Sequence, residues 1–110
     1  MKNVERESRL QEKIMQRLRA SGIYVYKNAQ NMYTEKGRPD LTACVPAKIG
    51  DNTYGLFVGI ELKRPGRLNG VSEAQEVVGR AIMKAGGIWI LSDDADYIEN
   101  HIKKVQEGRL

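Results

Sequence analysis

The stretch LFVGIELKRP, residues 56–65, begins as an apolar strand and ends on charged residues. The first five residues are hydrophobic without alternation, which predicts a strand that is buried on both faces. Glu61 and Lys63 follow two residues apart, and the period of two places both side chains on the same face of the strand. A small domain gains little by directing a carboxylate and an ammonium group inward unless they have a chemical role there. The stretch therefore predicts a central strand that ends in a functional site.

The segments on either side of this strand predict a single α/β domain. Apolar spacing, helix caps and β-branched content predict, in chain order, a helix over 4–20, strands over 23–27, 41–45 and 56–63, a helix over 73–85, a strand over 88–91 and a helix over 95–106. The tracts between them predict an exposed loop over 28–39, a hairpin turn over 46–54 and a basic loop over 64–71. The order α-β-β-β-α-β-α indicates a mixed β-sheet with helices on its faces, in one domain over residues 1–110.

Composition narrows the classes of function. Of the 110 residues, 41% are hydrophobic and 29% are charged, as in a globular protein. The single cysteine, Cys44, and the single histidine, His101, exclude a disulfide framework, a cysteine-based zinc site and a histidine cluster. No run approaches the roughly 18 apolar residues of a membrane span, and the first residues are too charged for a signal peptide. We therefore expect a cytoplasmic protein without membrane contact, whose net charge of +4 permits a polyanionic partner.

A second carboxylate begins the preceding strand, at Asp40 in the turn sequence GRPD. If the two strands pair as a hairpin, Asp40 and Glu61 converge at one end of the sheet. Two converging carboxylates, with water and phosphate oxygens, form the hard-oxygen environment that Mg²⁺ or Mn²⁺ prefers. Lys63 could then orient or deprotonate a water, or neutralise the charge that develops on a phosphate. The alternative is a surface salt-bridge cluster, which is common and weak.

The motif and its surroundings resemble a known nuclease family. The strings GRPDL at residues 37–41 and VGIELKRPGRLNGVSEAQ at residues 58–75 resemble the PD-(D/E)xK nuclease superfamily and, in their detail, its VRR-NUC branch, the virus-type replication-repair nuclease domain. A Pro-Gly loop, a serine-capped helix start and Gln75 follow the Glu-x-Lys, as is usual in that branch. The resemblance covers nearly the whole chain. It therefore implies the stand-alone domain of phages and bacteria, located in the bacterial host cell if phage-encoded.

The resemblance implies a restriction-endonuclease-like core that hydrolyses phosphodiester bonds in DNA with Mg²⁺ or Mn²⁺. It makes Asp40 and Glu61 metal ligands, with the backbone carbonyl of Leu62 as a further ligand. Lys63 would be the catalytic lysine. Gln75, in the first turn of the next helix, would support the site or contact a phosphate; otherwise it is a solvated helix residue.

The superfamily usually places one more acid on the first helix, and here the sequence departs from a simple match. At about 100° per residue, Glu7 falls in the middle of the apolar stripe of that helix, and Gln11 lies just beside it. Glu12 points to the far side. We therefore select Glu7 as the catalytic acid, with Gln11 next to it. The alternative is a glutamate that only favours the helix dipole.

Basic residues flank the proposed site in sequence, on strand ends and loops. We expect five of them to contact DNA phosphates: Lys27, Lys36, Arg38, Arg64 and Arg67. For each, the alternative is a solvated surface charge. The aromatic residues Tyr24, Tyr26 and Trp89 are predicted to pack in the core or on the sheet rather than to stack on bases.

The resemblance further implies structure-selective cutting of branched DNA, with Holliday junctions favoured. The alternatives are a flap or nicking nuclease, a restriction-like enzyme acting on double-stranded DNA, and a catalytically silent DNA-binding module. Because resolving a four-way junction needs two symmetric nicks, we expect a homodimer. The helices over 4–20 and 95–106 are the candidate interface elements because both carry apolar stripes.

Overall fold

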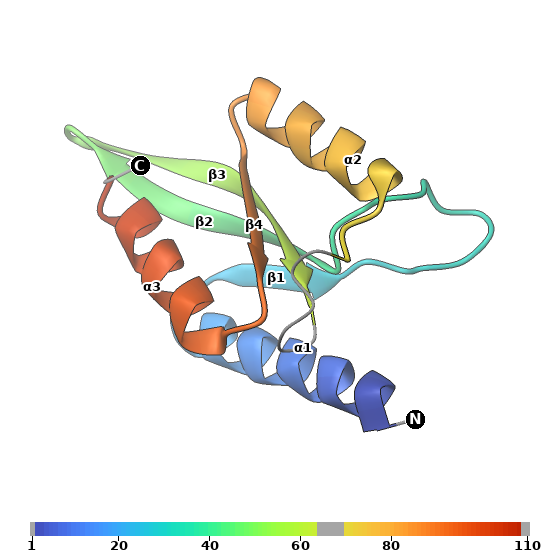
Figure 1. Ribbon diagram of the computed structural model, residues 1–110. Helices are drawn as coiled ribbons and strands as arrows, with labels where there is room; N and C mark the ends of the chain where they lie inside the picture. Colours follow the sequence, from blue (N-terminus) through green and yellow to red (C-terminus); the bar gives the residue numbers. More distant parts are fainter. Residues whose placement is uncertain (1, 64–69, 109–110) are drawn as a thin grey trace.

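The structure, a computed structural model, describes residues 2–63 and 70–108 and confirms the predicted α/β fold (Figure 1). Its elements follow the predicted order: α1 Lys2–Ala20, β1 Tyr24–Lys27, β2 Leu41–Ile49, β3 Asn52–Leu62, α2 Glu73–Lys84, β4 Ile88–Ser92 and α3 Ala95–Gln106. The predicted serine-capped helix start is confirmed at α2. Ser72 caps α2 through a capping box with Gln75, and Asp94 caps α3 by accepting a hydrogen bond from the Asp96 amide.

The four strands form one mixed sheet in the order β1-β2-β3-β4. The β1–β2 and β2–β3 pairs are antiparallel, whereas β3 and β4 are parallel and are joined through α2. The predicted hairpin turn lies within 46–54 but is much shorter than that segment. Both strands run on into that segment, and the reversal is confined to Gly50 and Asp51. The inward alternation that buries Val45 continues to Ala47, and this continuation extends the strand.

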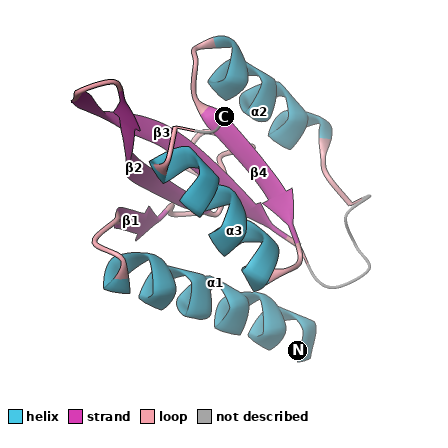
Figure 2. Ribbon diagram, turned by 90° about the vertical axis from the view of Figure 1, so that its left-hand side faces the viewer, coloured by secondary structure: helices cyan, strands magenta, loops and turns pink. Residues whose placement is uncertain are grey.

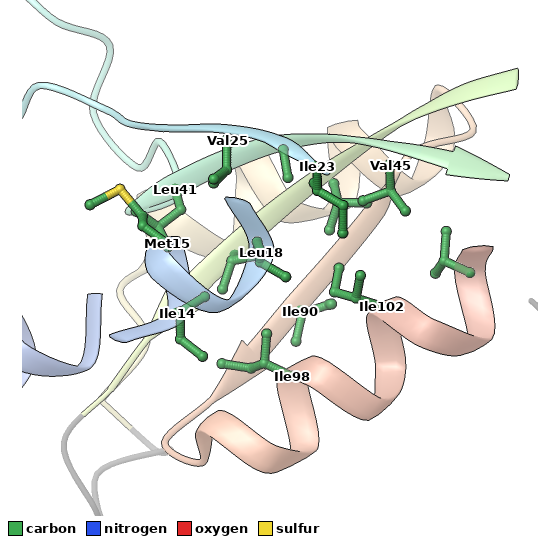
Figure 3. Close-up of a cluster of buried hydrophobic side chains, with 14 of the residues drawn as sticks. Ile14, Met15, Leu18, Ile23, Val25, Leu41, Val45, Ile90, Ile98 and Ile102 are labelled. Atoms are coloured by element: carbon green, nitrogen blue, oxygen red, sulfur yellow. The ribbon is translucent and has the colours of Figure 1, made fainter. Parts of the chain in front are cut away.

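One face of the sheet, the inner face, is covered by α1 and α3 (Figure 2). The core lies between these layers (Figure 3), and its largest fully buried side chains include Ile14, Leu18, Leu41, Ile60, Ile90, Ile98 and Ile102. Arg17 ties the two helices together, because its Nη1 lies 3.0 Å from both Asp96 Oδ1 and Glu99 Oε2. The apolar stripes of α1 and α3 are therefore used inside the molecule. This removes the reason for which the two helices were candidate interface elements.

The other face, the outer face, carries α2, on the opposite side of the sheet from α1 and α3 (Figure 1). Gly79 lets α2 approach β4 closely, since a Cβ at this position would lie 2.3 Å from the Trp89 ring. Trp89 is thus a packing residue, as predicted. The same prediction is wrong for a core role of Tyr24 and Tyr26, whose exposed fractions are 69% and 42%. Both alternate with the buried Val25 and so point to the outer face. They lie on β1, at the opposite edge of the sheet from β4, on which α2 packs.

Within residues 2–63 and 70–108, no helix is long and apolar enough to cross a membrane.

Candidate active site

Asp40 and Glu61 lie opposite each other at one end of the sheet. Leu41 pairs with Ile60 in the antiparallel register, so the next pair in that direction is Asp40 with Glu61. The Leu62 amide donates a hydrogen bond of 2.7 Å to Asp40 Oδ2, which fixes the aspartate against the end of β3. The predicted hairpin and the predicted convergence of the two carboxylates are both confirmed. The Leu62 backbone thus contacts the site through its N–H group.

Asn28 holds the backbone on which Asp40 stands. Its amide nitrogen Nδ2 donates to the Pro39 carbonyl at 2.9 Å and to Thr42 Oγ1 at 2.7 Å, and its backbone N–H donates to the Asp40 carbonyl at 2.9 Å. Asn28 and Pro39 are buried, so the two ends of the segment predicted as an exposed loop are part of the fold. We did not identify Asn28 from the sequence. Its only signal is an asparagine that directly follows a strand, which is also typical of ordinary turns.

Gln75 connects the two charged residues of the Glu-x-Lys motif. Its Nε2 donates to Glu61 Oε1 at 2.9 Å, and its Oε1 accepts from Lys63 Nζ at 3.1 Å. The capping box holds this side chain in place, because Oε1 also accepts from the Ser72 amide at 2.9 Å. Gln75 is therefore bound within the site and is not a solvated helix residue. The start of α2 orients Glu61 and Lys63 together through this one amide.

Glu61 is 1% exposed, which does not fit a surface salt-bridge cluster. Burial raises the pKa of Glu61 to about 8, and the nearby Asp40 carboxylate adds to the increase. Lys63 opposes the increase, and the Glu7 carboxylate contributes a smaller part of it. Among the described residues, no hydrogen-bond donor reaches Glu61 Oε2, and the Asp40 carboxyl lies close enough to share a proton with Glu61. The site thus concentrates negative charge where little water reaches it.

These features fit a divalent cation. A buried carboxylate oxygen without a partner, beside a second carboxylate, is a donor set of the kind that Mg²⁺ and Mn²⁺ prefer. A cation bound by Asp40 and Glu61 would relieve the repulsion between the carboxylates that raises the pKa of Glu61. Across the described part of the chain, no group of three or more His, Cys, Asp or Glu side chains is placed to hold a metal. The remaining positions would thus fall to backbone, water or phosphate oxygens.

The first helix brings Glu7 and Gln11 to the same end of the sheet. Glu7 is half-buried and acts electrostatically on Glu61, while Gln11 is half-buried with an Oε1 atom that has no partner among the described residues. Glu12 is exposed, as helical geometry predicts. Glu7 and Gln11 line a cavity of about 460 Å³ together with Ser8, Lys27, Asn28, Ala29 and Gln30. Glu7 is thus the first-helix acid that lies near the two carboxylates.

The candidate DNA contacts lie in different places. Lys27 is exposed at the end of β1 and lines the cavity beside Glu7. Lys36 and Arg38 are exposed on either side of Gly37, which has a φ of +88°. A Cβ at Gly37 would lie 2.2 Å from the backbone carbonyl oxygen of Ala74, so this loop packs on the first turn of α2. Arg64 and Arg67 lie outside the described residues.

Comparison of the chain with family models, with curated proteins and with solved structures finds no match.

Because the pKa of Glu61 is raised, we expect the free energy of unfolding of the metal-free protein to depend on pH. The folded protein keeps the Glu61 proton up to about pH 8, whereas the unfolded chain releases it near the ordinary value of 4.5. The free energy of unfolding should therefore fall as pH rises through this interval and level off above it. Glu61→Gln mimics the protonated acid, so it should remove this slope. At pH 8 it should raise the free energy of unfolding by on the order of 2 kcal/mol, less than the full pKa shift would give because the protein relaxes around a buried charge.

Urea unfolding of both proteins in chelator, at about pH 5 and about pH 8, measures this difference. The two proteins should differ at the higher pH and converge at the lower one. An equal dependence of the free energy of unfolding on pH in both proteins would show that the pKa of Glu61 is not raised in the folded state.

Proposed function

We propose that this protein is a metal-dependent endonuclease that hydrolyses phosphodiester bonds in DNA. The observation that supports it most strongly is the buried Glu61, which faces Asp40 and has an unpartnered Oε2 atom. A buried carboxylate beside a second carboxylate destabilises a fold unless a cation or a proton compensates the charge, so the presence of Glu61 next to the half-buried Asp40 favours a functional site. The Glu-x-Lys and Pro-Asp motifs that resemble the VRR-NUC branch supply the reaction class.

Each residue has a role in this proposal. Asp40 and Glu61 hold Mg²⁺ or Mn²⁺, with the Leu62 carbonyl as a further ligand. The bound cation would polarise the scissile phosphate and lower the pKa of a water. Lys63, which Gln75 holds at 3.1 Å, orients or deprotonates the attacking water or neutralises charge on the phosphate.

The substrate is proposed from the resemblance together with the surface charge. The net charge of +4 and the exposed Lys27, Lys36 and Arg38 near the site suit a DNA backbone. Arg64 and Arg67 would add to this set. The VRR-NUC resemblance favours branched DNA, with the Holliday junction first.

A panel of DNA substrates tests the proposal: supercoiled plasmid, linear duplex, a flap and a four-way junction, each with Mg²⁺ or Mn²⁺ and with chelator. We expect metal-dependent cleavage, strongest on the junction. Preferred cutting of the flap or nicking of the plasmid would select the flap or nicking alternative, and sequence-specific cutting of linear duplex the restriction-like one. Binding of all substrates without cleavage would indicate a silent DNA-binding module.

We expect the active form to be a homodimer. One metal centre engages one phosphate at a time, so paired symmetric nicks in a junction need two sites related by a two-fold axis. The chain has a mass of 12.4 kDa, and light scattering at micromolar protein concentration should give twice this mass. The same preparation should make paired nicks in one binding event. A strict monomer that still makes paired nicks in one event would contradict this expectation.

A further inference from the structure

The two tyrosines of β1 form an exposed aromatic surface that the nuclease site does not explain. Tyr24 and Tyr26, the tyrosine pair, are 69% and 42% exposed, and their ring centroids lie 5.8 Å apart with the planes tilted by 56°. The rings alternate with Val25, which is 3% exposed and anchors the strand in the core. The pair is thus presented on a fixed backbone.

The tyrosine pair lies on the same face of the sheet as the two carboxylates. Tyr26 pairs with Thr42, which pairs with Gly59, and the next row toward the site is Asn28, Asp40 and Glu61. Since a strand rises about 3.3 Å per residue, Tyr26 lies about 7 Å and Tyr24 about 13 Å along β1 from the carboxylate row. The tyrosine pair and the carboxylates therefore share one face of the sheet, with Asp40 and Glu61 displaced by one and two strands from β1.

The chemistry around the tyrosine pair suits a nucleic acid better than a second copy of the chain. The chain carries a net charge of +4, and the loop with the exposed Lys36 and Arg38 packs on the first turn of α2, beside Gln75 of the proposed site. A polyanion complements this charge. Edge-to-edge pairing with another strand is disfavoured, because β1 has four residues and Arg19 Nη2 already donates to the outward Val25 carbonyl at 3.3 Å.

We propose that Tyr24 and Tyr26 stack against unpaired bases of a single-stranded DNA segment next to the phosphate that is cut. A ring can stack only on a base whose face is open, so the tyrosine pair recognises unpaired nucleotides and not intact duplex. Exposed aromatic side chains on an open sheet bind unpaired bases in this way in other protein classes. The inference rests on the proposed nuclease function and narrows its substrate to DNA with a single-stranded portion near the cleavage point.

The test measures the affinity for a short oligo-dT strand and for a duplex of the same length, by fluorescence anisotropy in chelator. The double variant Tyr24→Thr/Tyr26→Thr removes both rings but keeps strand propensity, because β-branched threonine favours strands as aromatic residues do. We expect it to bind the single strand at least about tenfold more weakly and the duplex with unchanged affinity. The double variant Tyr24→Phe/Tyr26→Phe should bind like the original protein, because stacking does not need the hydroxyl group.

Tyr97→Ala is the matched control, since it removes a 54% exposed tyrosine from α3 on the opposite side of the sheet and should leave both affinities unchanged. Circular dichroism verifies the fold of each variant, and the phenylalanine variant provides a second reading if the threonine variant unfolds. Loss of single-strand binding in the phenylalanine variant, where both rings remain, would overturn the proposal. Equal single-strand affinity in the folded threonine variant would also overturn it. The proposal would also be overturned if the threonine variant became monomeric while its DNA affinity stayed unchanged, because the tyrosine pair would then contact a second copy of the chain.

The binding assay contains no metal and detects no cleavage. Failure of the stacking proposal would therefore leave a cleaving protein whose single-strand affinity does not depend on Tyr24 and Tyr26. Failure of the proposed function would leave a protein that binds through them and does not cut.

Discussion

Asp40→Asn and Glu61→Gln should each lower the rate of DNA cleavage by at least about 1,000-fold while leaving the protein folded. Each change keeps the shape of the side chain and removes one ligand charge. The two carboxylates face each other at the open end of the β2–β3 hairpin. Among the described residues, no third carboxylate is placed with them to replace either one as a metal ligand. Single-turnover cleavage of a four-way junction at saturating Mg²⁺ measures the loss, and urea unfolding verifies the fold.

Both variants should retain binding to branched DNA in chelator, because the basic loops carry that interaction. Asp51→Asn is the matched control. It changes an exposed aspartate in the turn at the far end of the same hairpin, and it should cleave at the original rate. Full nuclease activity in purified Asp40→Asn or Glu61→Gln would refute the assignment of the site.

Lys63→Ala is expected to lower the cleavage rate by about 100- to 1,000-fold and to leave metal binding intact. The lysine nitrogen donates to Gln75 Oε1 at 3.1 Å, so Gln75 positions it beside Glu61 without making it a ligand. A calorimetric titration with Mn²⁺ should give the same affinity for the variant and the original protein. Single-turnover cleavage at saturating Mn²⁺ should show the loss of rate.

Lys48→Ala is the control for this change, since Lys48 is exposed on β2 near the turn, away from the carboxylates. It should affect neither measurement. Loss of Mn²⁺ binding in Lys63→Ala, with normal cleavage at saturating metal, would show that the roles of lysine and ligand are wrongly assigned.

The element order and the convergence of Asp40 with Glu61 could be predicted because both follow from local patterns. Unbroken apolar runs define the buried strands, Ser72 marks a helix start, and a hairpin brings the ends of two adjacent strands together. The side of α1 that carries Glu7 followed from helical periodicity alone. These inferences need no knowledge of contacts between distant residues.

The remaining features depend on such contacts. Asn28 is part of the site because its side chain donates hydrogen bonds to Pro39 and Thr42. The composition of a turn does not reveal such contacts with residues distant in sequence. The exposure of Tyr24 and Tyr26 depends on where α2 lies on the sheet, and a residue type that favours strands does not reveal which face is covered. The burial of the apolar stripes of α1 and α3 likewise follows from which helices share the inner face.

The central claim is that Asp40 and Glu61 bind a divalent cation that the cleavage reaction requires. The most direct test is a titration with Mn²⁺ in which bound metal, by electron paramagnetic resonance, and cleavage rate are measured on the same samples of the original protein and of Asp40→Asn. The proposed site predicts that occupancy and rate rise together in the original protein and that both are lost in the variant. Cleavage at full rate in chelator, or unchanged Mn²⁺ occupancy in Asp40→Asn, would contradict it.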